Sequence, residues 1–414
     1  MFESLRSRNY RLFFVGELVS HTGGWMHNMA EAWLVLQLTD SGAAVGATFA
    51  CRFAPVFVFG LWGGSIVDRL DRWRTLVATQ LLLAVFAAVL WALAAADIVE
   101  AWMVFAVALA TGFVTLVEQP AHHAFVEEMV GPDRVANAVA LNSAVLNASR
   151  ITGPALAGLL IAATGTSWVF LANAASYVAV VFALLAMDRS QLRPLRREAE
   201  PTGVRDGLAH LWSVTELRAT VALVAVVGTL VYNFPTFLTI LADDTFGGDA
   251  DAAGALMAVL GAGTIVGALT AAHRARQSRR TVIVAAGLIG GSMLLTAVIE
   301  PRSLLVASLV PTGAAAVFFG ATASAHLQAA SAPQFRGRVM SVYATLTLGA
   351  TVIGGPLTGA ISDRWGARAG MGTAGAATIV AATVLVAVVR RGRTVDADDV
   401  VLAESSQVAV ETAT

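Results

Sequence analysis

The sequence predicts an all-α polytopic membrane protein with twelve transmembrane helices in two pseudo-symmetric bundles of six. Only 13% of the 414 residues are charged, which is about half of the 25% typical of a soluble domain. Uncharged stretches such as 75–96 recur along the chain, and about 20 apolar residues in a helix suffice to cross the hydrocarbon core. Motifs of the first half also return in the second half.

Hydrophobic runs between charged or Gly/Pro-rich segments predict the spans in chain order. The first half gives 12–38, 43–67, 75–96, 101–119, 137–163 and 167–187. The second half gives 219–242, 252–272, 281–299, 303–326, 338–362 and 370–389. The domains are then a first bundle, a cytoplasmic linker, a second bundle and a tail expected to be disordered: 1–187, 188–218, 219–389 and 390–414.

Two further expectations concern the linker and the N-terminus. Within the linker, 204–217 can form an amphipathic helix that lies on the membrane surface. The N-terminal hydrophobic stretch is longer than a signal-peptide core and lacks a clear cleavage site, so we interpret it as a retained first span. The lone Cys51 lies in a hydrophobic segment and indicates neither a disulfide nor a metal site.

The distribution of Arg residues predicts the orientation. All 27 basic residues are Arg. The N-terminus, the tail and the alternate loops that belong to the same side hold 22 of them, whereas the opposite loops hold only Arg302, Arg364 and Arg368. Because positive residues stay on the cytoplasmic side, both termini are expected inside. The Arg-, Ala- and Gly-rich composition is typical of a GC-rich bacterial genome, which places the protein in a bacterial plasma (inner) membrane.

An internal repeat supports a duplicated unit. Residues of spans two and five and of the loop before span five return at an offset of 202 or 203 residues: Gly64 as Gly267, Arg134 as Arg336, Gly153 as Gly355 and Pro154 as Pro356. Duplicated six-helix halves that bind a small molecule between them are a transporter architecture.

The loop between spans two and three carries a charged motif behind two glycines: Gly64, Asp68, Arg69, Arg72 and Arg74. It resembles the loop signature of the major facilitator superfamily, with Asp71 where the usual form has Gly. The helix dipole disfavours a carboxylate at the C-terminal end of span two, so Asp68 needs partners. The resemblance implies a gating clamp onto span eleven; the alternative is that these Arg residues only follow the positive-inside rule.

Span five carries a second resemblance, in the segment from Ser149 to Gly158. It is similar to the antiporter signature of that superfamily, with Ser149 and Ala157 in place of two glycines. Gly153 and Pro154 allow a bend, and together with Gly158 they allow close approach of another helix. Ordinary helix packing is the alternative. Longer stretches around spans one, five and eleven resemble the enterobactin-exporter and macrolide-efflux-like branch, which implies export.

Ionisable side chains within spans are functional candidates by default. Glu31 and Arg52 lie at similar depths in consecutive spans, so we expect them to pair. Glu17 and Arg150 lie nearer the inner face, and a long Arg side chain can bridge most of the distance between them by snorkelling. Each of these pairs could couple transport to protons or only fix helix packing.

The remaining polar candidates have weaker assignments. His21 and His27 are expected to be interior hydrogen-bonding groups, and Glu118, at the end of span four, to be interfacial together with His122 and His123. Glu118 is kept as a further proton-coupling candidate. Side chains proposed to line a substrate cavity are Asn28, Asn147, Asn233 and Phe237. The alternative for the aromatic ones is lipid contact or packing.

These observations favour a monomeric, proton-coupled exporter of a small amphipathic compound such as a drug, siderophore or secondary metabolite. A proton-coupled nutrient symporter is the alternative. An integral-membrane enzyme is disfavoured, because no embedded cluster has metal-ligand spacing and no Gly-rich phosphate loop is present. Neither a cofactor nor a metal, a nucleotide or a nucleic acid is expected as a partner.

Overall fold

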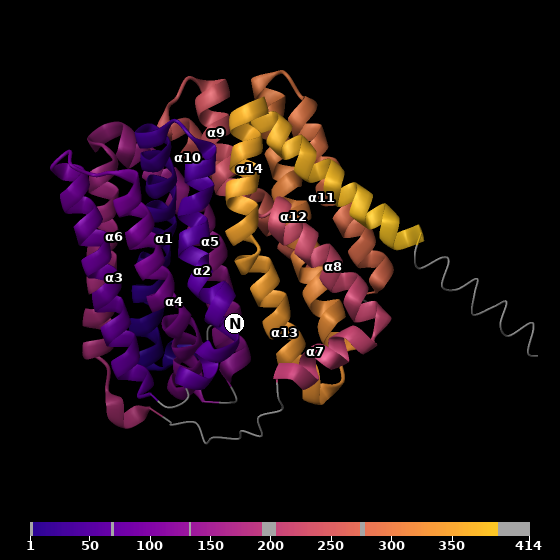
Figure 1. The fold of residues 1–414 in the computed structure, drawn as a ribbon. Helices are drawn as coiled ribbons and strands as arrows, with labels where there is room; N and C mark the ends of the chain where they lie inside the picture. Colours follow the sequence, from indigo (N-terminus) through magenta and orange to yellow (C-terminus); the bar gives the residue numbers. More distant parts are fainter. Residues whose placement is uncertain (1–2, 68–69, 132–133, 193–203, 274–277, 388–414) are drawn as a thin grey trace, which may run out of the picture.

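The computed structural model describes residues 3–67, 70–131, 134–192, 204–273, 278–387. The described residues form helices joined by short connections, arranged as two bundles side by side (Figure 1). The first bundle contains α1 Arg8–Thr39, α2 Gly42–Val67, α3 Arg72–Ala95, α4 Ala101–Val130, α5 Val135–Thr164 and α6 Thr166–Leu185. Its short 3-10 turns are η1 Ser4–Arg6 and η3 Arg189–Gln191.

The second bundle follows the linker helix α7 Val204–Ser213. It contains α8 Thr215–Leu230, α9 Phe234–Phe246, α10 Ala250–His273, α11 Arg279–Val298, α12 Arg302–Ala330, α13 Arg336–Ala344, α14 Thr351–Trp365 and a last helix over Ala367–Ala387. A 3-10 turn, η4 Pro333–Phe335, precedes α13, and a π-helical turn, η5 Thr345–Gly349, follows it.

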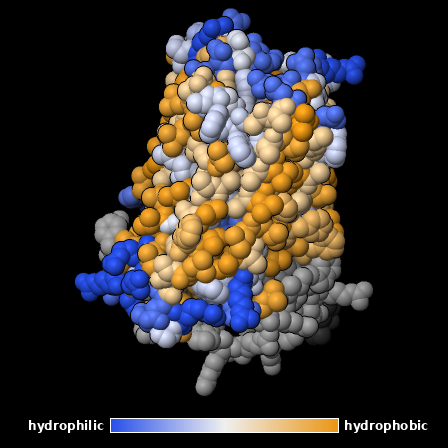
Figure 2. All heavy atoms as spheres, turned by 90° about the vertical axis from the view of Figure 1, so that its left-hand side faces the viewer, coloured by the Kyte–Doolittle hydropathy of each residue, from blue (hydrophilic) through white to orange (hydrophobic). Residues whose placement is uncertain are grey.

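Eleven helical segments of the described residues are long and apolar enough to cross a membrane. The first helix, α1, is 32 residues long, or about 48 Å at 1.5 Å per residue, but it falls outside this group. The difference has a chemical cause, because Glu17, His21, His27 and Glu31 lower its hydropathy. With α1 included, the twelve predicted spans are accounted for. An apolar band lies between two hydrophilic ends on the face shown in Figure 2.

Two predicted spans are interrupted helices. The predicted span 219–242 breaks between α8 and α9, where Asn233 precedes the first turn of α9 and Pro235 lies within that turn. Proline has no backbone N–H, so it suits a first helical turn and disfavours a continuous helix through this point. The predicted span 338–362 is divided into α13, the π-helical turn η5 and α14. Interrupted helices are tolerated in membranes where they line a cavity or lie against protein.

Two other predicted boundaries were wrong. The fourth span was expected to end at residue 119, but α4 continues through Pro120 to Val130. The predicted linker helix 204–217 ends at Ser213, and a separate helix, α8, begins at Thr215. His210 of α7 stacks on Phe335, with ring centroids 4.5 Å apart, so the linker helix packs against the segment that precedes α13.

The two bundles meet along α2 with α14 and α5 with α10. We name the end of the molecule that holds the α1–α2 and α5–α6 connections the outer end, after the predicted orientation. Near this end the backbones approach at glycines: a Cβ at Gly46 would lie 2.0 Å from the Gly355 carbonyl oxygen, and one at Gly359 would lie 2.1 Å from that of Gly42. Only glycine permits such an approach.

A carboxylate adds polar contacts at the same place. Asp363, near the end of α14, accepts hydrogen bonds from the backbone N–H groups of Gly42 at 2.5 Å and Ala43 at 3.0 Å, and from the Ser41 hydroxyl at 2.9 Å. The first N–H groups of a helix have no intrahelical partner and carry a positive partial charge. Asp363 thus satisfies the N-terminus of α2 from the other bundle, and the outer end is closed.

Candidate functional site

A buried acid–base cluster lies between α1 and α2. The Glu31 carboxylate is fully buried, and Arg52 donates a hydrogen bond to its Oε2 at 2.5 Å. His27, one helical turn before Glu31, lies 3.0 Å from Oε1 through its Nε2. The predicted contact between Glu31 and Arg52 is therefore present in the structure, and the predicted hydrogen-bonding role of His27 is too. Whether this pair couples transport to protons stays a prediction.

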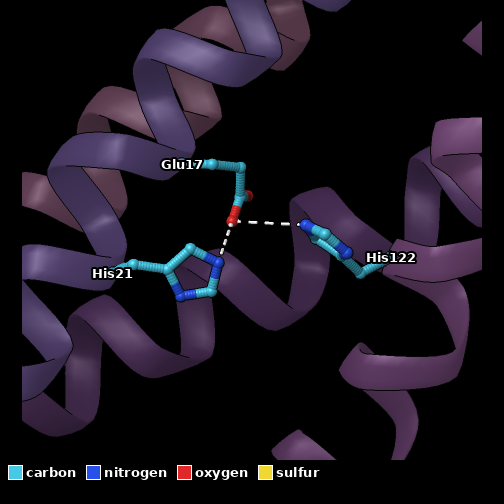
Figure 3. Close-up of side chains that lie close together, drawn as sticks. All are labelled: Glu17, His21 and His122. Carbon is cyan, nitrogen blue, oxygen red and sulfur yellow. Dashed lines mark ion pairs between the residues drawn. The ribbon is translucent and has the colours of Figure 1, made fainter. Parts of the chain in front are cut away.

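A second cluster lies fourteen residues earlier on α1, at Glu17 (Figure 3). Glu17 Oε2 lies 3.0 Å from Nε2 of His21 on the same helix and 3.3 Å from Nε2 of His122 on α4. Glu17 and His122 are buried, and the Glu17 Oε1 atom has no hydrogen-bond partner among the described residues. The His122 ring also packs against Phe13, with centroids 5.0 Å apart.

This cluster corrects two predictions. His122 was expected at the membrane interface, but α4 extends past it and buries it beside Glu17, while His123 is exposed. Glu118 lies one turn before His122 on the same helix and is half-buried. The expected bridge from Arg150 toward Glu17 is wrong, because Glu17 contacts two histidines and Arg150 lies over the Trp25 ring at 5.4 Å.

The sequence held one signal for these clusters that our prediction did not use. Glu17 and His21, His27 and Glu31, and Glu118 and His122 are each spaced four residues apart, which places such pairs on one helix face. The group Glu17, His21 and His122 also offers three ligand atoms within 4.8 Å of one another. One carboxylate and two imidazoles form a donor set that zinc accepts, but ion-pair contacts between the carboxylate and the two rings account for the same geometry.

A cavity of about 380 Å³ lies between the two bundles. Aromatic side chains form much of its wall: Trp25, Phe49, Phe53, Tyr232, Phe234 and Tyr343. The hydroxyl groups of Tyr232 and Tyr343 donate to backbone oxygens of α12, at Ala316 (3.1 Å) and Gly320 (2.9 Å). These bonds hold both rings in place beside the cavity.

Polar groups of both bundles reach this cavity. Arg150 and Asn28 come from the first bundle and Asn233 from the break between α8 and α9. The two asparagines were predicted as cavity residues, and both line it. The other two candidates are not among its lining residues: Phe237 is fully buried in a hydrophobic cluster formed by both bundles, and Asn147 donates to the Ser143 carbonyl oxygen at 2.8 Å on its own helix.

The glycines of span five pack against other helices. A Cβ at Gly153 would lie 2.5 Å from the Trp25 Cβ, and one at Gly158 would lie 2.9 Å from the Asp251 Cα of α10. Pro154 lies between them, and its carbonyl oxygen approaches Gly254. α5 remains one continuous helix from Val135 to Thr164. The close-approach role of the glycines is visible in these contacts, whereas a functional bend at Pro154 stays a prediction.

The charged loop between α2 and α3 is described only in part. Asp68 and Arg69 lie outside the described residues, and so does any contact of theirs with span eleven. Asp71 accepts a hydrogen bond from the Arg74 backbone N–H at 2.8 Å and so caps α3. Arg74 is largely exposed.

Arg72 has a partner that our sequence prediction missed. It forms an ion pair with Glu128 near the end of α4, and both side chains are largely buried. Arg72 thus ties α3 to α4 within the first bundle. Glu128 was missed because α4 was expected to end at residue 119.

Comparison with known proteins gives relatives over most of the chain. The multidrug efflux pump Tap of Mycolicibacterium fortuitum is 29% identical over 86% of this chain and 90% of its own length. Macrolide efflux protein A of Streptococcus pyogenes is 22% identical over 86% and 91%. The staphyloferrin A transporter of Staphylococcus aureus is 24% identical over 63% of this chain and 66% of its own length.

Solved structures share the fold at low identity. A mutant of the nucleoside transporter NupG superposes with a TM-score of 0.73 at 15% identity, over 92% of this chain and 99% of that one. A bacterial homologue of the human lysosomal transporter Spinster, inward-facing and occupied, gives 0.72 at 13% identity, over 94% and 97%. The transmembrane secretion effector family matches residues 1–412. The chain is therefore a multi-pass membrane transporter, not an enzyme, and belongs to the transmembrane secretion effector family of the major facilitator superfamily.

Proposed function

We propose that the protein exports a small amphipathic compound in exchange for protons, by alternating access between its two bundles, in a bacterial plasma membrane with both termini in the cytoplasm. The observation that supports this proposal most strongly is the Glu31–Arg52 pair. It is a buried, titratable contact between α1 and α2, and α2 packs against α14 of the other bundle.

Protonation of Glu31 has a direct consequence for this pair. Arg cannot deprotonate, so an ionised Glu31 is held by a charge-assisted hydrogen bond to Arg52. A proton on the carboxyl group removes the attraction and releases the guanidinium. Phe49 and Phe53, which flank Arg52 on α2, both line the cavity. A change at Arg52 is therefore transmitted to the cavity wall within one turn of helix.

Glu31 is a better coupling candidate than Glu17 because of where each contact leads. Glu17 contacts His122 on α4, within the first bundle. Glu31 contacts Arg52 on α2, and α2 packs along α14 of the second bundle. The two carboxylates are separated by about 21 Å along α1 at 1.5 Å per residue. In this proposal Glu17 and Glu118 stay in the first bundle as secondary acid–base groups, and the partly exposed His21 side chain gives Glu17 access to solvent.

The closed outer end defines one state of the cycle. The Gly46–Gly355 and Gly42–Gly359 contacts and the hydrogen bonds of Asp363 all join the bundles there. Opening to the outside requires these contacts to separate. We propose that Asp68, with the Arg residues that follow it, performs the corresponding task at the cytoplasmic end when the cavity faces outward.

The direction of transport is inferred from the relatives. Two of them are named as efflux proteins, and none of the geometry described above depends on direction. A symporter that imports a nutrient would use the same buried carboxylates, so direction requires its own experiment.

Everted membrane vesicles that contain the protein provide this experiment. With the lumen acidified, they should accumulate at least one member of a radiolabelled amphipathic panel of anionic, neutral and cationic compounds, and a protonophore should abolish the accumulation. Glu31→Gln should remove uphill accumulation, whereas Glu216→Gln, at an exposed surface carboxylate, serves as the matched control. Uphill uptake into right-side-out vesicles instead would establish import, and accumulation that survives collapse of the gradient would refute proton coupling.

A further inference from the structure

Arg150 brings a positive charge to the cavity between the two bundles. Among the described residues that line the cavity, it is the only one with a charged side chain. Its guanidinium lies 5.4 Å from the centroid of the Trp25 ring, and it has no ion pair with a carboxylate in the described part of the chain. Arg150 is exposed, so its charge is accessible to a molecule that enters the cavity. Within its described lining, the cavity therefore carries a positive charge without a counter-charge.

The buried carboxylates of the first bundle do not supply the missing counter-charge. Glu31 is occupied by Arg52 and His27. Glu17 is occupied by His21 and His122, and Glu128 is occupied by Arg72. A bound molecule that carries its own negative charge would therefore compensate Arg150 without disturbing either cluster.

A second observation concerns hydrogen bonding. Asn233 is buried at the break between α8 and α9, and its side-chain amide donates to the Thr229 carbonyl oxygen at 2.7 Å. This bond fixes the orientation of the amide. The Oδ1 atom of Asn233 is left without a partner, and so is that of Asn28 across the cavity wall. A buried acceptor without a donor is costly, and both residues line the cavity. A ligand with hydroxyl or amide donors would supply the missing hydrogen bonds to these two Oδ1 atoms.

The third observation is the aromatic wall. Trp25, Phe49, Phe53 and Phe234 offer ring faces and edges to a molecule in the cavity. Aromatic rings pair favourably with other rings in stacked or edge-on geometry. The Arg150 guanidinium is planar and matches a carboxylate or another planar oxyanion through two parallel hydrogen bonds.

We propose that the cavity selects an aromatic anion that also carries a hydroxyl or amide donor. The oxyanion would lie against Arg150, the donor group against Asn233 or Asn28, and the ring between the aromatic side chains. This inference rests on the proposed function for its relevance to transport, but it concerns binding alone. A lipophilic cation, in contrast, would meet Arg150 with no carboxylate in the described lining to receive it.

Equilibrium dialysis with the purified full-length protein tests the selection. Three probes share one naphthalene ring and one hydroxyl group and differ in charge: hydroxynaphthoate, naphthol and hydroxynaphthylmethylammonium. Hydroxynaphthoate should bind at least about tenfold more tightly than the ammonium compound, a difference of about 1.4 kcal/mol. Naphthoate, which lacks the hydroxyl group, should bind more weakly than hydroxynaphthoate. Tighter binding of the ammonium compound, or no binding of hydroxynaphthoate, would overturn the proposal.

Variants identify the charge that is responsible. Arg150→Met should abolish the preference for the anion, and Arg150→Lys should keep its sign. Asn28→Asp adds a carboxylate to the lining and should shift the preference toward the ammonium compound. Arg302→Gln is a matched control, because Arg302 also lies over an aromatic ring, Phe246 at 5.6 Å, but near the outer end. An unchanged order of affinities in a folded Arg150→Met protein refutes the assignment.

Binding and transport can fail separately. Dialysis needs neither a gradient nor a direction, so an importer or an uncoupled carrier would still show the preference for the anion. Conversely, vesicles that export only cationic members of the panel would support export and contradict the substrate class.

Discussion

Replacing Glu31 with Gln removes a carboxylate that accepts a hydrogen bond from Arg52 and contacts His27, and it keeps nearly the same side-chain volume. The guanidinium of Arg52 then remains in the membrane interior without its counter-charge. An unpaired charge at the centre of a span costs about 2.5–3.5 kcal/mol on the insertion scale. We therefore expect Glu31→Gln to lower the unfolding free energy by about 3 kcal/mol.

The single variant Arg52→Gln and the double variant Glu31→Gln/Arg52→Gln should behave differently from Glu31→Gln. Arg52→Gln leaves Glu31 with His27 still 3.0 Å away, so its cost should be smaller than that of Glu31→Gln. The double variant leaves no orphaned charge, and its stability should return to within about 1 kcal/mol of the parent protein. Thermal unfolding in detergent, with expression level as a second readout, measures all four proteins.

Transport by the double variant separates coupling from packing. If Glu31 carries the coupled proton, the double variant folds, exchanges substrate downhill and fails to accumulate it against a gradient. If the pair only fixes α1 against α2, restored stability brings restored accumulation. Full proton-driven accumulation by the double variant would refute our assignment and transfer it to Glu17.

Three further predictions concern the two ends of the molecule. Gly359→Ala places a Cβ 2.1 Å from the Gly42 carbonyl oxygen and should destabilise the closed outer end by about 1–3 kcal/mol. The measurement is the reaction with a thiol reagent added from the outer side, which should increase. Gly291→Ala is the control, because its Cβ would meet open space, and it should leave this reaction unchanged. Asp363→Asn should weaken the same closure without blocking it, and normal accessibility would contradict the role of this carboxylate. Asp68→Asn should lower turnover more than substrate binding, and equal turnover at matched expression would remove the clamp.

Helix content and the count of spans were readily predicted because hydropathy over about 20 residues is a strong signal. The contact between Glu31 and Arg52 was predicted for a similar reason: consecutive antiparallel spans place residues of equal depth next to each other. That argument needs only the rise per residue and two span boundaries.

Where a boundary was wrong, the local prediction was wrong too. Ending span four at residue 119 put His122 at the interface and left Glu128 out of consideration, whereas α4 buries His122 and pairs Glu128 with Arg72. The breaks near Asn233 and at η5 were missed because hydropathy does not depend on whether the helix is continuous. The segment from Asn233 to Pro235 was the available signal.

The low hydropathy of α1 has a consequence for how the chain enters the membrane. α1 is synthesised before α2 and carries Glu17 and Glu31, and each charged residue near a span centre opposes insertion. The counter-charge for Glu31 lies 21 residues later, on α2. Inserting α1 and α2 together as a hairpin would bring this pair into the lipid already neutralised. The contact proposed to respond to protons would then also set the order of assembly, because α1 must wait for its partner helix.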